Sequence, residues 1–195
     1  MKGPLFYSKI LLFGEYGIIQ DSKGLSIPYN FYNGALKKED HPSPEAIASN
    51  GHLKRFVTYL ESLQTEQPDL VQFDIATLQK DVNEGMYFDS SIPQGYGVGS
   101  SGALVAAIYD KYAQHKITVL ENLTREKLLE LKTIFSQMES FFHGKSSGLD
   151  PLNSYLSIPI LINSKDNIEA TGIPTQSFDG KGAVFLLDSG IVGET

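Results

Sequence analysis

The stretch from residue 93 to residue 102 reads Pro93-Gln94-Gly95-Tyr96-Gly97-Val98-Gly99-Ser100-Ser101-Gly102, and a helix-compatible apolar run from Ala103 to Tyr109 follows it. Glycine lets a backbone approach an anion closely because it has no Cβ atom. The first N–H groups of a helix lack partners within the helix, and the helix dipole adds roughly half a positive charge there. With two serines able to cap the helix, the pattern predicts a phosphate-binding loop that opens a helix, in preference to a plain glycine-rich turn.

The same stretch also fits the dinucleotide-binding pattern G-x-G-x-x-G, through Gly97, Gly99 and Gly102. In that alternative, residues 117–120 form the next strand, and Glu121 stands about twenty residues on, where a Rossmann-type fold places the acid that binds ribose. Pro93 argues against it, because proline is disfavoured in the central strand that would precede such a loop. We therefore rank the dinucleotide-binding alternative second.

Composition limits the class of protein. The chain has 195 residues, 41% of them hydrophobic, which suits one large domain or two small ones with a sizeable core. A net charge of −7 argues against a nucleic-acid partner. There is no cysteine, and the four histidines are scattered, so neither disulfides nor a zinc site is expected. Residues 1–9 lack signal-peptide features, and no apolar stretch nears the roughly 18 residues that span a bilayer, so we expect a cytoplasmic protein that does not bind membranes.

Hydrophobic periodicity predicts an α+β fold, with strands mostly early and helices grouped in the middle. A first helix is expected from Pro44 to Leu63, with Ser43 before it, a break near Gly51, and Ile47 on its apolar face. A second helix should cover residues 103–113, and a third should begin at Thr124 and run to about residue 142. The strands are expected at residues 5–7, 10–13, 18–19, 24–37, 71–78, 86–92, 158–163 and 183–187.

Two further stretches carry groups suited to chemistry. Glu139 lies at the edge of an apolar helix face, where a carboxylate needs a cation or metal as partner, and Asp150 follows two glycines on what is expected to be a sharply turned loop. Lys9 lies inside an apolar strand pattern. If Lys9 meets Asp150, its charge stabilises the carboxylate and can help orient a hydroxyl group. Each residue also has a purely structural interpretation: Glu139 as a solvated helix residue, Asp150 as a helix cap and Lys9 as a solvent-facing cation on an edge strand.

Together these stretches resemble the GHMP kinase superfamily, and within it the mevalonate kinases. The K-x-I-L-x-G-E element of that family is similar to residues 9–15, the P-x-x-x-G-x-G-S-S-A loop to residues 93–103, and the E-x(4)-G-x(3)-G-[IL]-D element to residues 139–150. The resemblance implies a ribosomal protein S5 domain 2-like fold for the N-terminal domain. It also implies an ATP- and Mg²⁺-dependent kinase acting on a small-molecule alcohol.

Residue roles follow from the same resemblance. Asp150 is implied as the base that accepts the hydroxyl proton, with Lys9 beside it, and Ser101 and Glu139 as Mg²⁺ ligands. The residues implied to contact ATP are Gly95, Gly97, Gly99, Ser100, Ser101 and Gly102. Those implied to contact the acceptor are Glu15, Tyr16 and His143. Mevalonate kinases usually carry histidine where Tyr16 stands, whereas phosphomevalonate kinases can carry Gly-Glu-Tyr, so the acceptor stays open between these isoprenoid precursors and related hydroxy acids.

The family's third glycine-rich motif is not found in the sequence. We therefore expect residues 1–195 to be the N-terminal ATP-binding domain alone, without the C-terminal GHMP domain that closes over the acceptor. On that expectation the chain alone turns over poorly, and its exposed interdomain face favours a homodimer. A catalytically inactive, kinase-like binding domain is the remaining alternative.

Overall fold

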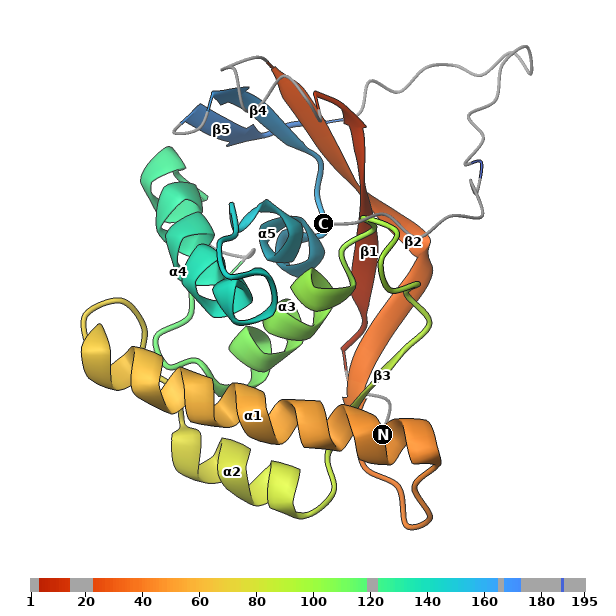
Figure 1. Cartoon of the computed structure of the whole chain (residues 1–195). Helices are drawn as coiled ribbons and strands as arrows, with labels where there is room; N and C mark the ends of the chain where they lie inside the picture. Colours follow the sequence, from red (N-terminus) through yellow and green to blue (C-terminus); the bar gives the residue numbers. More distant parts are fainter. Residues whose placement is uncertain (1–3, 15–22, 119–122, 165–166, 173–186, 188–195) are drawn as a thin grey trace.

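The computed structural model describes residues 4–14, 23–118, 123–164, 167–172 and 187. Strands and helices are mixed along this part of the chain (Figure 1). Their order is β1 (Phe6–Phe13), β2 (Gly24–Lys37), α1 (Pro44–Glu66), α2 (Ile75–Asn83), β3 (Tyr87–Ser90), α3 (Ser100–Tyr112), α4 (Arg125–His143), α5 (Leu149–Leu156), β4 (Ile160–Ser164) and β5 (Asn167–Ala170). The α+β prediction is confirmed. The expected strands at residues 18–19 and 183–186 lie outside the described residues.

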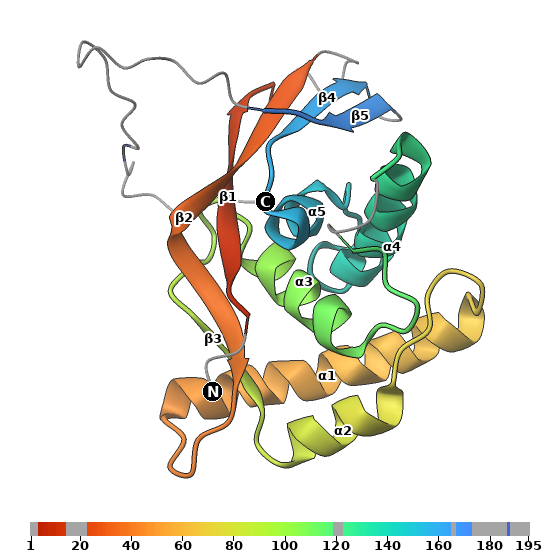
Figure 2. The same ribbon diagram turned by 180° about the vertical axis from the view of Figure 1, so that it is seen from behind.

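The strands form one five-stranded sheet in which every described pair is antiparallel. The order is β1-β2-β4-β5, and β3 pairs with the other end of the long strand β2. Figures 1 and 2 show α3, α4 and α5 on one side of the β1–β2 pair. Residues of β1 therefore face α3 and α5, which pack against this side of the sheet.

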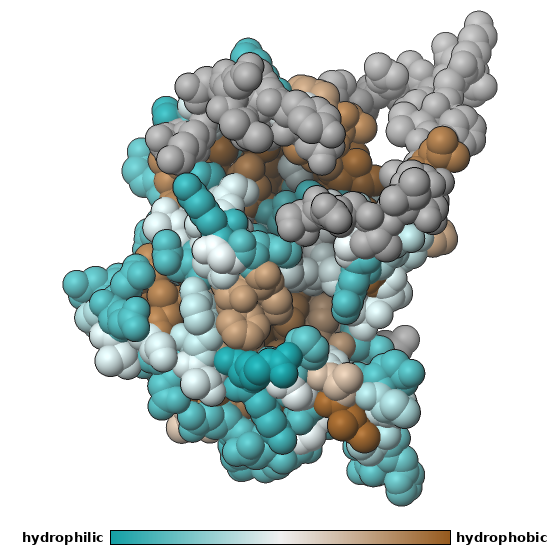
Figure 3. All heavy atoms as spheres, in the orientation of Figure 1, coloured by the Kyte–Doolittle hydropathy of each residue, from teal (hydrophilic) through white to brown (hydrophobic). Residues whose placement is uncertain are grey.

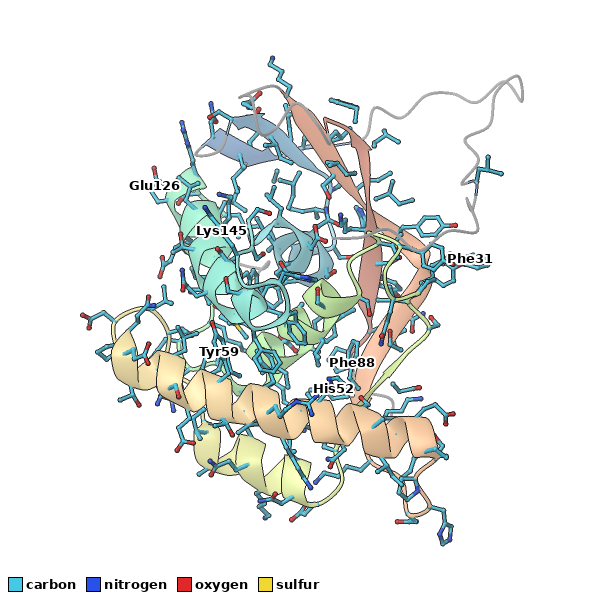
Figure 4. All side chains as sticks on the ribbon, in the orientation of Figure 1. Phe31, His52, Tyr59, Phe88, Glu126 and Lys145 are labelled. Carbon is cyan, nitrogen blue, oxygen red and sulfur yellow. The ribbon has the colours of Figure 1, made fainter. Side chains whose placement is uncertain are left out.

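The pairing of β1 with β2 is interrupted by a bulge. Tyr7 pairs with Asn33, but its neighbour Ser8 pairs with Tyr29, so residues 30–32 are extra residues on β2. Bulges of this kind bend a strand and re-aim side chains. Phe31 projects away from the sheet (Figure 4) and is 73% exposed.

Helix α1 begins as predicted, because the Ser43 side chain accepts a hydrogen bond from the Ala46 N–H. It does not break at Gly51 but continues to Glu66. The assignment of Ile47 to the buried face is wrong, since Ile47 is 60% exposed and Ala46 is buried instead. Tyr59 lies between α1 and α4 (Figure 4), and its hydroxyl donates to the Gln137 carbonyl oxygen at 2.6 Å.

The strand predicted at residues 71–78 is wrong. Asp74 accepts a hydrogen bond from the Thr77 N–H and caps α2, which buries Leu78 and Val82, four residues apart. Only Phe73 retains strand character, as an isolated bridge to Ala113. The strand expected at residues 86–92 exists as the shorter β3, but it pairs with β2. A helix cap and a four-residue spacing therefore prevail over the period-two pattern.

The sharply turned loop expected around Asp150 is instead the beginning of helix α5. Gly148 is its N-cap in a left-handed conformation, and Pro151 lies in its first turn, where a missing N–H costs no hydrogen bond. Asp150 therefore stands in the first turn of a helix, and neither on a free loop nor at a cap. The strand expected at residues 158–163 is β4, which begins at Ile160.

Helix α3 runs through the middle of the core, and every residue from Gly102 to Tyr109 is buried. It begins at Ser100, three residues before the predicted start. On the face drawn in Figure 3, hydrophilic side chains cover most of the lower part, where α1 and α2 lie. In the described part of the chain, no helix combines the length and the apolar character that crossing a membrane requires.

Candidate active site

The glycine-rich loop is anchored at both ends to the β1–β2 pair. At its start, the Ser91 N–H donates to the Asn33 carbonyl oxygen at 2.9 Å, beside the bulge. At its end, the Lys9 N–H donates to the Val98 carbonyl oxygen at 3.0 Å. Gly95 and Gly97 between these anchors, and Gly99 directly after the second, all have positive φ, which side-chain-bearing residues rarely adopt. These glycines are therefore required by the path that the backbone takes into α3.

The start of α3 lacks the serine cap that the sequence suggested. Gly99 is the N-cap, in a left-handed conformation, and no side chain of the described residues caps the helix. The Ser101 hydroxyl instead donates to Glu139 Oε1 at 2.9 Å. The first-turn N–H groups of α3 thus remain available to an anion, and the helix dipole favours one.

Lys9 and Asp150 meet as an ion pair. Lys9 Nζ lies 3.0 Å from Asp150 Oδ1, and the Lys9 side chain is only 11% exposed, against 32% for that of Asp150. A hydrogen bond from the Ser154 hydroxyl to the Tyr7 carbonyl oxygen, at 2.8 Å, ties α5 to β1 alongside the pair. The aspartate thus keeps one fixed cationic partner while its side chain still reaches solvent.

Two glycines allow this pair to sit against α3. A Cβ atom on Gly99 would lie 3.0 Å from Cγ of Lys9. A Cβ atom on Gly102 would lie 2.7 Å from the backbone carbon of Asp150 and the nitrogen of Pro151. Gly102 was predicted as a phosphate contact, which stays a prediction. Its clear structural role is to let the first turn of α5 pack against the first turn of α3.

Glu139 is a buried acid, 4% exposed, at the centre of the site. Ser101 donates to its Oε1 and Ser146 to its Oε2. Burial raises the pKa of Glu139 to about 7, and the negative charge of Asp150 adds to the effect, although both serine hydrogen bonds and Lys9 act in the opposite direction. A carboxylate in these surroundings would be stabilised by a cation.

The donor set fits Mg²⁺. A carboxylate and a hydroxyl are hard oxygen ligands, and magnesium in nucleotide sites usually takes one or two protein carboxylates together with phosphate oxygens and water. No group of three or more acidic, histidine or cysteine side chains that could hold a metal occurs among the described residues. Ser101 and Glu139 are thus the candidate ligands, and a bound nucleotide would have to supply further oxygen ligands.

His143 lies beside this set, with its Nε2 3.0 Å from the Ser101 hydroxyl oxygen. It was predicted to contact the acceptor, and it lies next to a predicted Mg²⁺ ligand. Glu15 and Tyr16 lie outside the described residues. Sequence reasoning missed the part played by Ser146. The signal available was a hydroxyl seven residues after Glu139, beyond the turn at Gly144.

The dinucleotide-binding alternative is not supported by the fold. A Rossmann-type loop joins a parallel strand to a helix, whereas β3, the strand before α3, pairs antiparallel with β2. Residues 117 and 118 are not in a strand, and Glu121 lies outside the described residues.

Comparison with known proteins gives one family and several similar structures. Residues 60–157 match the family model of the GHMP kinases N terminal domain. No curated protein matches the chain. Three similar solved structures are mevalonate kinases. The one from methicillin-resistant Staphylococcus aureus MRSA252 has 18% identity and a TM-score of 0.44, over 85% of this chain and 53% of that one. The Methanococcus jannaschii enzyme has 14% identity and a TM-score of 0.49, over 88% and 56%. The L. major enzyme, in complex with R-mevalonate, has 18% identity and a TM-score of 0.47, over 87% and 55%. The chain thus spans about half the length of these structures.

Proposed function

The chain belongs to the GHMP kinases through their N-terminal domain, and from this premise we propose that it binds Mg-ATP and serves phosphoryl transfer to the hydroxyl group of a small molecule. The observation that carries the proposal is a convergence on the start of α3. The Lys9–Asp150 ion pair and the Ser101–Glu139 hydrogen bond flank the glycine-rich loop there. A phosphate-binding backbone, a metal-ligand pair and a candidate base thus occupy one place.

In this proposal the loop holds the nucleotide. The uncapped N–H groups at the start of α3 and the backbone of Gly95, Gly97 and Gly99 face the phosphates, with Ser100 and Gly102 at the same turn. Ser101 and Glu139 hold the Mg²⁺, which when bound neutralises phosphate charge. When the Ser101 oxygen binds a cation through a lone pair, its hydroxyl can still donate a hydrogen bond to His143 Nε2.

Asp150 is the proposed base for the acceptor hydroxyl. Phosphoryl transfer depends more on positioning and charge neutralisation than on covalent catalysis, so one fixed carboxylate suffices. Lys9 holds one carboxylate oxygen through the 3.0 Å contact and leaves the other for the acceptor. This intact pair favours a catalytic domain over an inactive, kinase-like binding domain.

The acceptor is proposed to be a small hydroxy acid or isoprenoid precursor, with mevalonate and phosphomevalonate as the leading candidates. Support comes from the motif around Gly14, Glu15 and Tyr16 and from the element between Glu139 and Asp150. We take residues 1–195 as the ATP-binding domain and expect efficient turnover to need the second GHMP domain.

ADP release by the complete gene product, measured with a panel of small alcohols, tests the proposal. Asp150→Asn should lower turnover by roughly 100- to 10,000-fold while nucleotide binding persists, because it removes the proton acceptor and the charge paired with Lys9 but leaves the loop, Ser101 and Glu139 in place. Asp110→Asn is the matched control, since Asp110 lies near the far end of α3, where it pairs with Lys116. If Asp150→Asn retains full turnover, Asp150 is not the base. If the protein releases no ADP with any of the alcohols tested, the proposed kinase activity fails.

A further inference from the structure

We propose that Ser146 is a positioning residue of this site, whose hydroxyl fixes the Glu139 carboxylate and joins it to the start of the helix that carries Asp150. The inference rests on the proposed function, because it assigns Ser146 a role in holding the metal-binding carboxylate. Lys145, labelled in Figure 4, marks the turn between α4 and α5 in which Ser146 stands.

Ser146 forms hydrogen bonds with both α4 and the start of α5. Its hydroxyl donates to Glu139 Oε2 and accepts a hydrogen bond from the Gly148 N–H at 3.0 Å. Gly148 is the N-cap of α5, two residues before Asp150. One oxygen atom thus links the proposed metal ligand on α4 to the helix that positions the proposed base.

The hydrogen-bond inventory fixes the direction of this link. A serine hydroxyl has a single proton to donate. The ionised Glu139 carboxylate only accepts, and the Gly148 N–H is itself a donor to the Ser146 oxygen, so the serine proton is directed to Glu139. The Ser101 hydroxyl is different, since it has two acceptors within reach, Glu139 Oε1 at 2.9 Å and His143 Nε2 at 3.0 Å. Ser146 is therefore the constant donor to the carboxylate, whereas Ser101 can turn its proton away.

The turn that holds Ser146 is itself anchored on α4. The Ser136 hydroxyl donates to the Ser146 carbonyl oxygen at 2.6 Å. A Cβ atom on Gly148 would collide with the Lys132 carbonyl oxygen and lie 2.7 Å from the Ser136 nitrogen, so this turn packs directly on the α4 backbone. The position of the Ser146 hydroxyl is thus fixed by the turn. The neighbouring Ser147 is exposed, and among the described residues the bond seen for its hydroxyl is one accepted from the Leu149 N–H at 3.3 Å.

Loss of the hydroxyl would leave a carboxylate oxygen in a largely buried group without its Ser146 donor. Groups that orient a metal ligand typically change metal affinity by about 10- to 100-fold when they are removed. The effect should appear in metal binding itself, before any chemistry, because Glu139 can then rotate away from the arrangement in which it meets Ser101.

A matched pair of variants tests the role. Ser146→Thr keeps the hydroxyl. Ser146→Val introduces a side chain of nearly the same shape as threonine but without the hydroxyl. The probe is Mn²⁺ added to the chain with saturating ADP, with free Mn²⁺ followed by electron paramagnetic resonance and corrected for the Mn²⁺ that the same ADP binds without the chain. We expect Ser146→Val to weaken Mn²⁺ binding roughly 10- to 100-fold and Ser146→Thr to bind within about threefold of wild type. Ser140→Ala should bind like wild type, because in the described part of the chain the Ser140 hydroxyl bonds within α4, to the Ser136 carbonyl oxygen.

The outcomes separate the two proposals. If wild-type chain binds no Mn²⁺ with ADP, the proposed function fails. If wild type binds and Ser146→Val binds equally well, only the positioning role fails. If Ser146→Thr loses as much affinity as Ser146→Val, the hydroxyl is not responsible, and the positioning role is again overturned. Ser136→Ala removes the anchor of the turn but keeps the donor to Glu139, so it should weaken Mn²⁺ binding less than Ser146→Val does. An equal loss would assign the effect to the turn and overturn the role of the hydroxyl.

Discussion

Gly102→Ala perturbs the closest approach of α3 to α5. The added Cβ atom would lie 2.7 Å from the Asp150 carbon and the Pro151 nitrogen, whereas ordinary contacts begin at 3.4 Å, so the two helices must part by about 0.7 Å. The obstructing atoms are backbone, so a side-chain rotation cannot relieve the clash. Overpacking of this kind costs roughly 1–3 kcal/mol, and the better helix propensity of alanine returns about 1 kcal/mol. Because the obstructing atoms are backbone, we take the overpacking cost at its upper end, about 3 kcal/mol, and expect a net loss of about 2 kcal/mol in the free energy of unfolding.

Urea denaturation of the purified chain measures this loss, and Gly51→Ala is its control. Gly51 is also inside a helix, but among the described residues no heavy atom outside its own stretch of helix lies within 4 Å of its Cβ position. The same substitution there should stabilise the chain by roughly 0.5–1 kcal/mol. If both variants are stabilised alike, the tight packing of Gly102 on α5 is refuted. In the complete gene product, a shift of Asp150 by this amount should also lower turnover, since a misplacement of about 1 Å can cost roughly 100-fold.

Two further predictions concern charge. Because the pKa of Glu139 is raised from 4.5 to about 7 in the folded chain, metal-free wild type should lose up to about 3 kcal/mol of stability as pH rises through this window, at about 1.4 kcal/mol per pKa unit. Urea denaturation between pH 4 and 8 should show Glu139→Gln without this loss; parallel profiles would contradict the reasoning. Burial alone raises the pKa of Asp81, but hydrogen bonds from Lys111, Tyr112 and Lys38 prevail and hold the pKa well below 3.8, so its stabilisation is present above that pH and fades below it. Asp81→Asn should therefore cost about 2 kcal/mol at pH 7 and much less in acid, and an equal cost at both would count against the network.

Local signals in the sequence predicted the elements whose ends are set locally. Ser43 and Thr124 both cap helices because their side chains bond N–H groups three residues on. The same signals misled where two patterns overlapped. Asp74 looked like one residue of an alternating strand, although it caps a helix. The glycines before Asp150 indicated a sharply turned loop, although Gly148 is the N-cap of a helix.

The site itself depends on contacts that no local pattern contains. The pairing of Lys9 with Asp150 joins β1 to α5, the last helix of the described residues, and only the family resemblance brought these residues together in advance. The second acceptor of Ser101, the close approach at Gly102 and the link through Ser146 arise from the way α3, α4 and α5 pack. The extent of Glu139 burial appears only when those helices are assembled. Its place at the edge of an apolar helix face predicted the need for a cation from the sequence, but its raised pKa could not be predicted.

Calorimetric titration of the chain with ATP, with and without Mg²⁺, tests the central claim most directly. The account predicts that ATP binds with heat that depends on Mg²⁺, that NAD binds more weakly than ATP, and that Glu139→Gln removes the Mg²⁺ dependence while the fold persists. Absence of ATP binding, tighter binding of NAD without Mg²⁺, or unchanged Mg²⁺ dependence in Glu139→Gln would contradict it.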